Sequence, residues 1–418
     1  MIDPKSGLDD FLDVVIDGGL IKNIGKFQAN NSYEEIIDAR GKIVAPGLID
    51  VHVHFRYPGF THKEDMESGG AAAIAGGFTT VVCMANTKPI IDNSETLLDV
   101  LEMAEKSPIH IKTVAAVSKG FEGKELTDMA LLKKLGAAGF SDDGMPLLDP
   151  AFVLKAMQAA KELDVPISLH EEDSCLIGTA GVNDGKVSAA FGIKGAPAVS
   201  ESSMAARDCM LALDSGAKVH IQHVSCKQTV AAVRLAKEMG ARITAEASPF
   251  HFSLTEDAVL VHGALAKLNP PLRSEEDRYA IIEGLKDGAI DMIATDHAPH
   301  SREEKSRPFA QAPSGLIGLE TTLALGITNL VKTGHLGITE LIRKMTAAPA
   351  RLYGFNAGFL AEGGPADIAI FDDQETWIVS EFRSKSANSP LIGQTLTGKV
   401  KYTICKGKIL YRDGGITR

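Results

Sequence analysis

Two histidines separated by one residue, His52 and His54, end the first strongly apolar strand expected in the chain, Leu48–His54. Side chains alternate between the two faces of a strand, so both imidazoles should point the same way. Two neutral imidazoles at one strand end can hold a metal ion such as zinc. Such a pair can equally be packed or exposed without a metal, so further residues are needed to separate the two interpretations.

Similar residues stand at the ends of other expected strands. His170, His223 and Asp296 each end one, and the fourth strand runs into Asp142 and Asp143. Barrel enzymes build their active sites at the C-terminal ends of the strands, so these side chains should converge on one mouth. Alone, each histidine would more often be structural, and Asp142-Asp143-Gly144 a turn; together they favour a metal centre.

Six nitrogen and oxygen ligands exceed the three that one catalytic zinc uses, so two metal ions sharing a carboxylate fit better. We expect His52, His54 and Asp296 on one ion and His170 with His223 on the other. An aspartate of the fourth strand would bridge the two ions. His220, three residues before His223, is expected to face the opposite way and to be structural.

The elements that must position these residues are strands alternating with amphipathic or Ala-rich helices. Eight strands in this alternation favour a (β/α)8 TIM-type barrel over an open doubly wound sheet, whose G-x-G-x-x-G fingerprint is absent. The expected strands are Leu48–His54, Thr79–Ala85, His110–Val117, Ala137–Ser141, Pro166–His170, Lys218–His223, Arg242–Glu246 and Asp291–Asp296. The expected helices are Glu95–Lys106, Thr127–Leu135, Ala151–Leu163, Ser200–Ser215, Lys227–Met239, Glu275–Asp287 and Ile338–Met345.

Short alternating strands at both chain ends predict a second, smaller unit. Asp13–Asp17 and Leu20–Ile24 flank a Gly-Gly turn, and Asp367–Asp372 and Tyr402–Lys406 have the same texture. We therefore expect a small β-sandwich domain formed by residues 1–46 and 352–418, with the catalytic barrel, residues 47–351, inserted between its halves.

Composition narrows the class of protein. The 43 basic and 54 acidic residues give a net charge of −11, which argues against nucleic acid as a partner. Five scattered cysteines, without a C-x-x-C pair, fit a reducing compartment. Neither a signal peptide nor an apolar run long enough for a membrane span is evident. We expect a cytoplasmic enzyme with a small-molecule substrate and no membrane association.

Two motifs carry a resemblance to the dihydroorotases, of the bacterial type I within the cyclic amidohydrolase superfamily. Asp50–Gly59 resembles their first signature, and Ala294–His300 with Lys305 resembles the second. The resemblance implies a metal-dependent barrel with a β-sandwich made from both chain ends. It also implies zinc, two ions per subunit, on these ligands: His52, His54, Asp143, His170, His223 and Asp296.

Within the resemblance, Asp143 is preferred to Asp142 as the bridge because it precedes His170 by 27 residues, as in the bacterial type I enzymes. Many relatives bridge the ions with a carboxylated lysine, but no lysine stands at Ser141-Asp142-Asp143. An aspartate bridge is therefore implied.

The implied reaction is the reversible cyclisation of N-carbamoyl-L-aspartate to L-dihydroorotate in de novo pyrimidine biosynthesis. A zinc-activated hydroxide would attack, and Asp296 would act as general acid and base. Arg56 offers a planar fork for a substrate carboxylate. The other implied substrate contacts are His54, Asn86, Asn269, His300, Ser314 and Gly315, although Ala312-Pro313-Ser314-Gly315 departs from the sequence usual in the family.

Two rival interpretations remain open. One is another cyclic amidohydrolase, acting on hydantoin or allantoin, which the missing lysine disfavours. The other is a non-catalytic homologue that scaffolds aspartate transcarbamoylase, although such a protein should have lost metal histidines. A homodimer is expected, and association with aspartate transcarbamoylase is a further expectation. The polar segment Ser301–Ala312 is expected to be a loop over the site.

Overall fold

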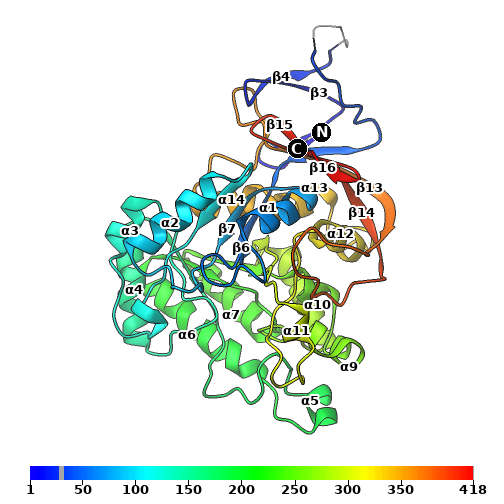
Figure 1. Cartoon of the computed structure of the whole chain (residues 1–418). Coiled ribbons are helices and arrows are strands. Elements are labelled where there is room, and N and C mark those ends of the chain that lie inside the picture. The colour runs from blue at the N-terminus through cyan, green and yellow to red at the C-terminus, as the bar shows by residue number, and fades with distance from the viewer. Residues whose placement is uncertain (28–32, 418) are drawn as a thin grey trace.

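The computed structural model describes residues 1–27 and 33–417 of the chain. It has two parts: a barrel surrounded by helices, and a smaller β domain that contains both chain ends (Figure 1). The predicted architecture is confirmed, since parallel strands alternate with helices through the central part of the chain.

Parallel strands form the barrel. One sheet has the order β6-β7-β8 and the other β9-β10-β11-β12, and all neighbours are parallel. Isolated parallel bridges close the ring, because Phe140 pairs with Ala115 and Ile167 while Val53 pairs with His297. The strands are β6 (Leu48–Val53), β7 (Phe78–Cys83), β8 (His110–Thr113), β9 (Pro166–Leu169), β10 (Lys218–Ile221), β11 (Ile243–Ala247) and β12 (Met292–Ile293).

The fourth barrel strand is shorter than the predicted Ala137–Ser141. Only Phe140 forms bridges, yet the backbone amides of Ala138, Phe140 and Ser141 donate to carbonyls of both neighbouring strands. The prediction located the strand correctly, and hydrogen bonds to both sides keep it in the ring.

The outer helices begin where the sequence supplies caps. Asp65, Asn93, Asp149 and Ser274 each accept a first-turn amide of the helix that follows. The helices are α1 (Met66–Ala75), α2 (Ser94–Glu105), α3 (Met129–Leu135), α4 (Pro150–Glu162), α5 (Lys186–Phe191), α6 (Ala198–Ser215), α7 (Lys227–Glu238), α8 (Pro249–Ser253), α9 (Asp257–His262), α10 (Glu275–Asp287), α11 (Arg302–Lys305), α12 (Thr322–Gly326), α13 (Ile338–Met345) and α14 (Ala347–Tyr353), with 3-10 turns η1 (Lys119–Phe121) and η2 (Gly263–Ala266) and a π turn η3 (Ile327–Val331).

Both chain ends build the small β domain. Strand β5 pairs antiparallel with β13, so that Pro46 lies opposite Ile368 in a sheet of order β16-β15-β14-β13-β5. Its own buried cluster joins Ile21 of the β3-β4 hairpin to Ile370 and Ile404 of that sheet. The strands are β1 (Ile2–Asp3), β2 (Leu8–Asp9), β3 (Asp13–Asp17), β4 (Leu20–Gly25), β5 (Ile43–Pro46), β13 (Ile368–Ile378), β14 (Thr395–Cys405), β15 (Lys408–Arg412) and β16 (Gly415–Ile416).

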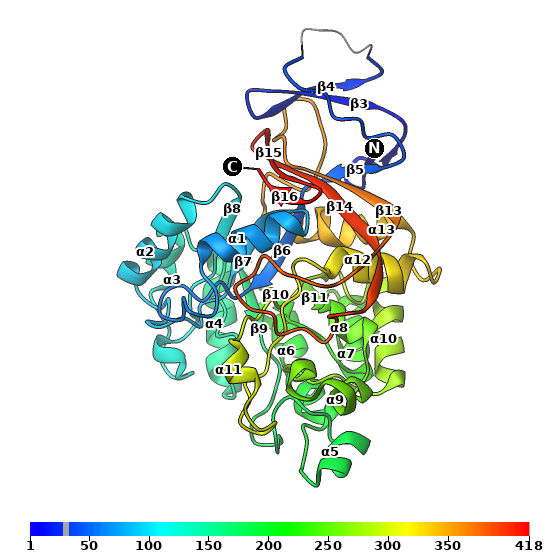
Figure 2. The same ribbon diagram turned by 45° about the vertical axis from the view of Figure 1, so that its right-hand side comes forward.

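The small β domain lies at the end of the barrel where strand β6 begins. Strand β6 follows β5 almost directly, so it enters the barrel beside the small domain and its C-terminal end points away from that domain. Helices α5 and α9 lie at that far end (Figure 2). The predicted domain limits, 1–46 with 352–418 and 47–351, stay a prediction. No helix of the described residues is both long and apolar enough to cross a membrane.

Candidate metal centre and anion site

His52 and His54 face two aspartates at the C-terminal end of the barrel. His52 Nε2 lies 3.4 Å from Asp143 Oδ1 and 3.5 Å from Asp296 Oδ1. His54 Nε2 lies 3.1 Å from Asp296 Oδ1 and 3.5 Å from Asp143 Oδ2. The pair at the end of β6 therefore points at a carboxylate from the fourth strand and at another from the end of β12.

His170 and His223 complete the cluster on the other side of Asp143. His170 Nδ1 lies 2.9 Å from His223 Nε2, and each of these nitrogens lies 3.7 Å from Asp143 Oδ1. Two groups have their ligand atoms within 4.8 Å of one another: His52, His54 and Asp296, and His52, Asp143 and His223. The structure thus brings together all six residues predicted as ligands.

Neighbouring side chains fix the tautomers of the first two histidines. His52 Nδ1 donates to Glu246 Oε1 at 2.6 Å, and His54 Nδ1 donates to Asn86 Oδ1 at 2.9 Å. With the proton of a neutral ring on Nδ1, Nε2 would be the atom that holds a metal, and it is Nε2 that faces the aspartates. Asn86, predicted as a substrate contact, also donates to Asp143 Oδ2 at 3.2 Å.

Two buried ring nitrogens of the cluster lack a hydrogen-bond partner. His52 Nε2 and His223 Nδ1 are buried and have no hydrogen-bond partner among residues 1–27 and 33–417. Burial lowers the pKa of His52, but Asp143, Glu246 and Asp296 outweigh this and raise it well above its usual value. The carboxylates that favour a proton on His52 would equally favour a divalent cation, which would take the place of that proton.

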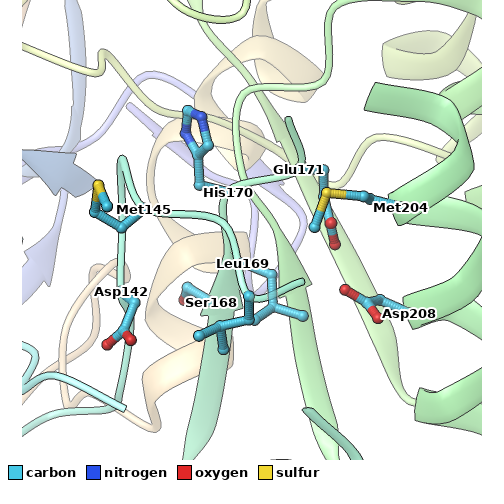
Figure 3. Close-up of a pocket in the computed structure, with 9 residues that line it drawn as sticks. Asp142, Met145, Ser168, Leu169, His170, Glu171, Met204 and Asp208 are labelled. Carbon is cyan, nitrogen blue, oxygen red and sulfur yellow. The ribbon is translucent and has the colours of Figure 1, made fainter. Parts of the chain in front are cut away.

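Asp142 and Asp143 point in different directions. Asp142 Oδ1 accepts the backbone amides of Val117 at 2.7 Å and Ser118 at 3.1 Å, and the Ser118 hydroxyl donates to Oδ2. Figure 3 shows the Asp142 carboxyl turned away from the His170 ring. The carboxylate that meets the histidines is that of Asp143, in line with the choice made from the spacing.

A second pair of acids lies beside His170. The buried Glu171 and Asp208 carboxyls face each other next to Met204 (Figure 3). Burial raises the pKa of Asp208, with Arg207 opposing, and burial followed by Asp208 raises that of Glu171 well above its usual value. Burial and mutual repulsion thus favour a protonated Glu171, and both of its carboxyl oxygens lack a hydrogen-bond partner in the described residues.

Three residues of the cluster region have strained backbones. Arg56 has φ +57°, His223 +31° and Asp296 +48°, in the left-handed region that non-glycine residues rarely adopt. Each stands just after a strand end, where the strain turns its side chain toward the mouth. This explains why His220 does not face away from His223 as expected: β10 ends at Ile221, and the turn at His223 breaks the alternation. The structural role expected for His220 fits its burial and its bonds to Thr244 and Glu246.

The predicted substrate contacts form a second group next to the histidines. Arg56 Nε donates to Pro299 O at 3.2 Å, and its Nη2 lies 3.4 Å from His300 Nε2. His300 Nε2 donates to Ser314 O at 2.8 Å. Burial, then Arg56, lowers the pKa of His300 to about 2, so the ring is neutral. Burial lowers the pKa of the Arg56 guanidinium to about 10, and Asp296 and Asp143 oppose this shift.

Asn269 is predicted in the same group. It lies between η2 and α10, and its Oδ1 is buried without a hydrogen-bond partner in the described part of the chain. Gly315 follows Ser314, with a φ of +134° that favours glycine. The structure therefore groups Arg56, His300, Ser314 and Gly315 and leaves a free amide oxygen on Asn269.

Sequence reasoning missed the side chains that hold the histidines. Glu246 ends the predicted strand Arg242–Glu246, so its place at a strand end was the available signal. It accepts from His52, from the His223 amide at 3.2 Å and from His220 Nε2 at 3.0 Å. Glu172 Oε2 lies 3.4 Å from His170 Nε2. Metal-binding histidines commonly donate to such carboxylates.

Comparison with known proteins supplies the family. The dihydro-orotase-like family matches residues 41–229. The dihydroorotase of Clostridioides difficile is 59% identical over 411 residues, covering 98% of this chain and 98% of its own. That of Lactococcus lactis subsp. lactis is 57% identical over 415 residues, covering 99% of this chain and 97% of its own.

Among solved structures, the L-hydantoinase (dihydropyrimidinase) from Arthrobacter aurescens has a TM-score of 0.86 at 25% identity, covering 97% of this chain and 94% of its own. That similarity extends over both the barrel and the small domain. With relatives more than half identical over almost its whole length, this chain belongs to the dihydroorotases of the cyclic amidohydrolase superfamily.

Proposed function

We propose that the chain catalyses the reversible cyclisation of N-carbamoyl-L-aspartate to L-dihydroorotate at a two-zinc centre. Family membership supplies the dihydroorotase activity and its place in pyrimidine biosynthesis. The mechanism rests on one observation, the meeting of four histidines with Asp143 and Asp296, beside a half-buried arginine that forms no ion pair among the described residues.

The donor set suits zinc. Four imidazoles and two carboxylates are borderline and hard ligands of the kind zinc takes, and His52 Nε2 lacks a partner. His52, His54 and Asp296 would hold one ion, His170 and His223 the other, and Asp143 would bridge them without a carboxylated lysine. Bound zinc would supply Lewis acidity, polarising the amide carbonyl and acidifying water.

Asp296 is the proposed general base and acid. Burial raises the pKa of this carboxyl, but His52 and His54 outweigh it and lower the pKa below its usual value, so the group is ionised at neutral pH. During hydrolysis it accepts a proton from the attacking water. It then delivers that proton to the ring nitrogen as the bond from this nitrogen to the acyl carbon breaks. Cyclisation runs through the same transfers in reverse.

The substrate carboxylate is proposed to bind Arg56. The guanidinium is half-buried and offers two parallel donors to a carboxylate. Asn86, Asn269, His300 and the backbone of Ser314 and Gly315 would orient the ring, and His54 would contact both metal and substrate. A neutral His300 keeps Nδ1 as an acceptor for a substrate N–H, since Nε2–H is already donated to Ser314.

The decisive experiment combines turnover with metal analysis. Dihydroorotate hydrolysis is followed by ultraviolet absorbance while zinc is measured in the same sample. We expect two zinc per chain, activity lost on chelation, and activity lost in Asp296→Asn. The neighbouring aspartates give a matched pair: Asp143→Asn should lose zinc, whereas Asp142→Asn should keep it. Equal zinc loss in both variants would contradict the bridge.

The same measurement separates the rivals. A zinc-loaded protein that cleaves hydantoin or allantoin but not dihydroorotate would contradict the substrate assignment. A zinc-free protein that becomes active only with aspartate transcarbamoylase would show that its site is incomplete alone. The homodimer, the association with aspartate transcarbamoylase and the cytoplasmic location stay predictions, and light scattering of the purified protein tests the first.

A further inference from the structure

Two buried lysines lie beside the group formed by Arg56, His300, Ser314 and Gly315, which we call the anion site. Neither lysine has a role in the mechanism above. Lys267 follows η2, and Lys305, the last residue of the second signature, ends α11; only 3% and 6% of their surfaces are exposed. In the described part of the chain, both ammonium groups donate hydrogen bonds only to backbone carbonyls, and Lys267 Nζ also lies 4.9 Å from the centre of the Phe309 ring. A buried charge without an ionic partner is costly, so its presence calls for a reason.

Both lysines hold the same stretch of backbone, residues 309–315. Lys267 Nζ donates to Phe309 O and Ala312 O, each at 2.7 Å. Lys305 Nζ donates to Pro313 O and Gly315 O, each at 3.0 Å. The two lysines are also joined, because Lys305 Nζ donates to Lys267 O at 3.3 Å. We call this pair the lysine clamp.

The clamped backbone is the one that faces the anion site. Ser314 O accepts from His300, whose ring lies against Arg56. A Cβ on Gly315 would lie 2.7 Å from the Cβ of Ala298 and 3.0 Å from His300 Nε2, so this backbone is pressed closely against the ring. Lys305 thus binds the backbone of a predicted substrate contact, Gly315, and Lys267 binds the backbone at Ala312, shortly before it.

The two ammonium groups of the clamp affect each other. Burial, followed by repulsion from Lys267, lowers the pKa of Lys305 to about 7, so an anion nearby would favour its charged form. Glu304 opposes this shift of the Lys305 pKa, but its carboxylate is paired with Lys63 at 2.8 Å. Buried charges are poorly screened, and several of one sign around a low-dielectric pocket attract an ion of the other sign.

We propose that Lys267 and Lys305 are specificity-determining residues, which hold residues 309–315 against the site and select an anionic cyclic amide over a neutral one. This rests on the proposed function, in which the substrate carries a carboxylate. Arg56 would bind that carboxylate directly, and the clamp would supply the surrounding positive potential and the fixed backbone.

The test compares an anion with its neutral counterpart in Lys305→Met. We expect the KM for L-dihydroorotate to rise about tenfold or more, with kcat changed less. The inhibition constant of the uncharged carboxamide of dihydroorotate should stay within threefold. Lys305→Arg, which keeps the charge, should restore most of the KM. The matched control is Lys344→Met: Lys344 is equally buried and donates to Ile290 O at 3.0 Å, but it is paired with Glu340.

Each other outcome overturns the proposal. An unchanged KM for L-dihydroorotate in Lys305→Met would show that the clamp has no role in substrate selection. Equal weakening of L-dihydroorotate and carboxamide binding would show that the clamp is only structural. Lys267→Met is the second variant, expected to give the same selective loss. If both methionine variants fail to fold while Lys344→Met folds, the clamp is structural and the proposal fails. A wild-type enzyme inert toward dihydroorotate would instead contradict the proposed function.

Discussion

Replacing Glu246 by glutamine should weaken zinc binding without unfolding the barrel. Glu246 is buried on β11 and accepts from the His52 ring, the His223 amide and the His220 ring. His52 and His223 are two of the proposed ligands. One carboxylate therefore sets the orientation of ligands from two strands, β6 and β10.

The size of the effect follows from these contacts. In Glu246→Gln the amide oxygen can still accept from His52, while the amide NH2 donates to His220 Nε2. His220 Nδ1 can then donate to Thr244 Oγ1, 2.9 Å away, so the hydrogen bonds survive and only the charge is lost. A charged hydrogen bond contributes about 1.5–3 kcal/mol and a neutral one about 0.5–1.5. A difference of about 1.4 kcal/mol corresponds to a tenfold weaker zinc affinity.

Competition with a chromophoric chelator measures this affinity, and calorimetry checks the fold. Glu201→Gln is the matched control, because Glu201 is equally buried and accepts the Ser225 amide but touches none of the histidines. We expect a weakening of about 10- to 100-fold in Glu246→Gln alone. Zinc affinity within threefold of wild type, with an unchanged melting temperature, would refute the argument that Glu246 orients the ligands.

Three further predictions concern single side chains. Glu172→Gln should weaken only the zinc bound by His170, so metal analysis at limiting zinc should approach one ion per chain; retention of two would contradict this. Arg56→Met should raise the KM for dihydroorotate about 100-fold or more at unchanged zinc content, and a change in kcat alone would oppose the assigned role. Burial raises the pKa of Glu320 to about 7, so the folded protein keeps a proton that the unfolded chain releases above about pH 4.5, and stability should fall as pH rises from about 4.5 to 7. Glu320→Gln should remove that part of the slope in melts between pH 5 and 8, and an unaltered slope would reject it.

Most of the site could be predicted from the residues that stand at the ends of the expected strands. A parallel barrel collects the C-terminal ends of its strands at one mouth, so His52, His170 and Asp296 could be grouped before any coordinates were known. The spacing choice of Asp143 over Asp142 agrees with the geometry, since Asp142 is occupied by Val117 and Ser118. These inferences needed only the direction of the chain and the order of its elements.

Tertiary contacts account for what was missed. Glu246 reaches His52 across 194 residues of sequence, and Lys305 reaches the carbonyl of Lys267 across 38. Neither partner can be inferred from local pattern, because each depends on how strands and loops are arranged around the mouth. His220 was misplaced for a related reason: alternation holds only while the strand lasts, and β10 ends at Ile221.

The fold alone does not select the substrate, since a hydantoinase shares it at a TM-score of 0.86. Selection must therefore lie in side chains at the mouth. On the proposed function, metal ions held by the histidine cluster would polarise any cyclic amide, whereas Arg56 and the lysine clamp would respond to charge on the rest of the ring. If this division is correct, loss of Glu246 and loss of Lys305 should affect different quantities. Loss of Glu246 should lower the zinc affinity of the enzyme and so affect every substrate alike. Loss of Lys305 should change only the preference for an anionic substrate and should leave the zinc affinity as it was.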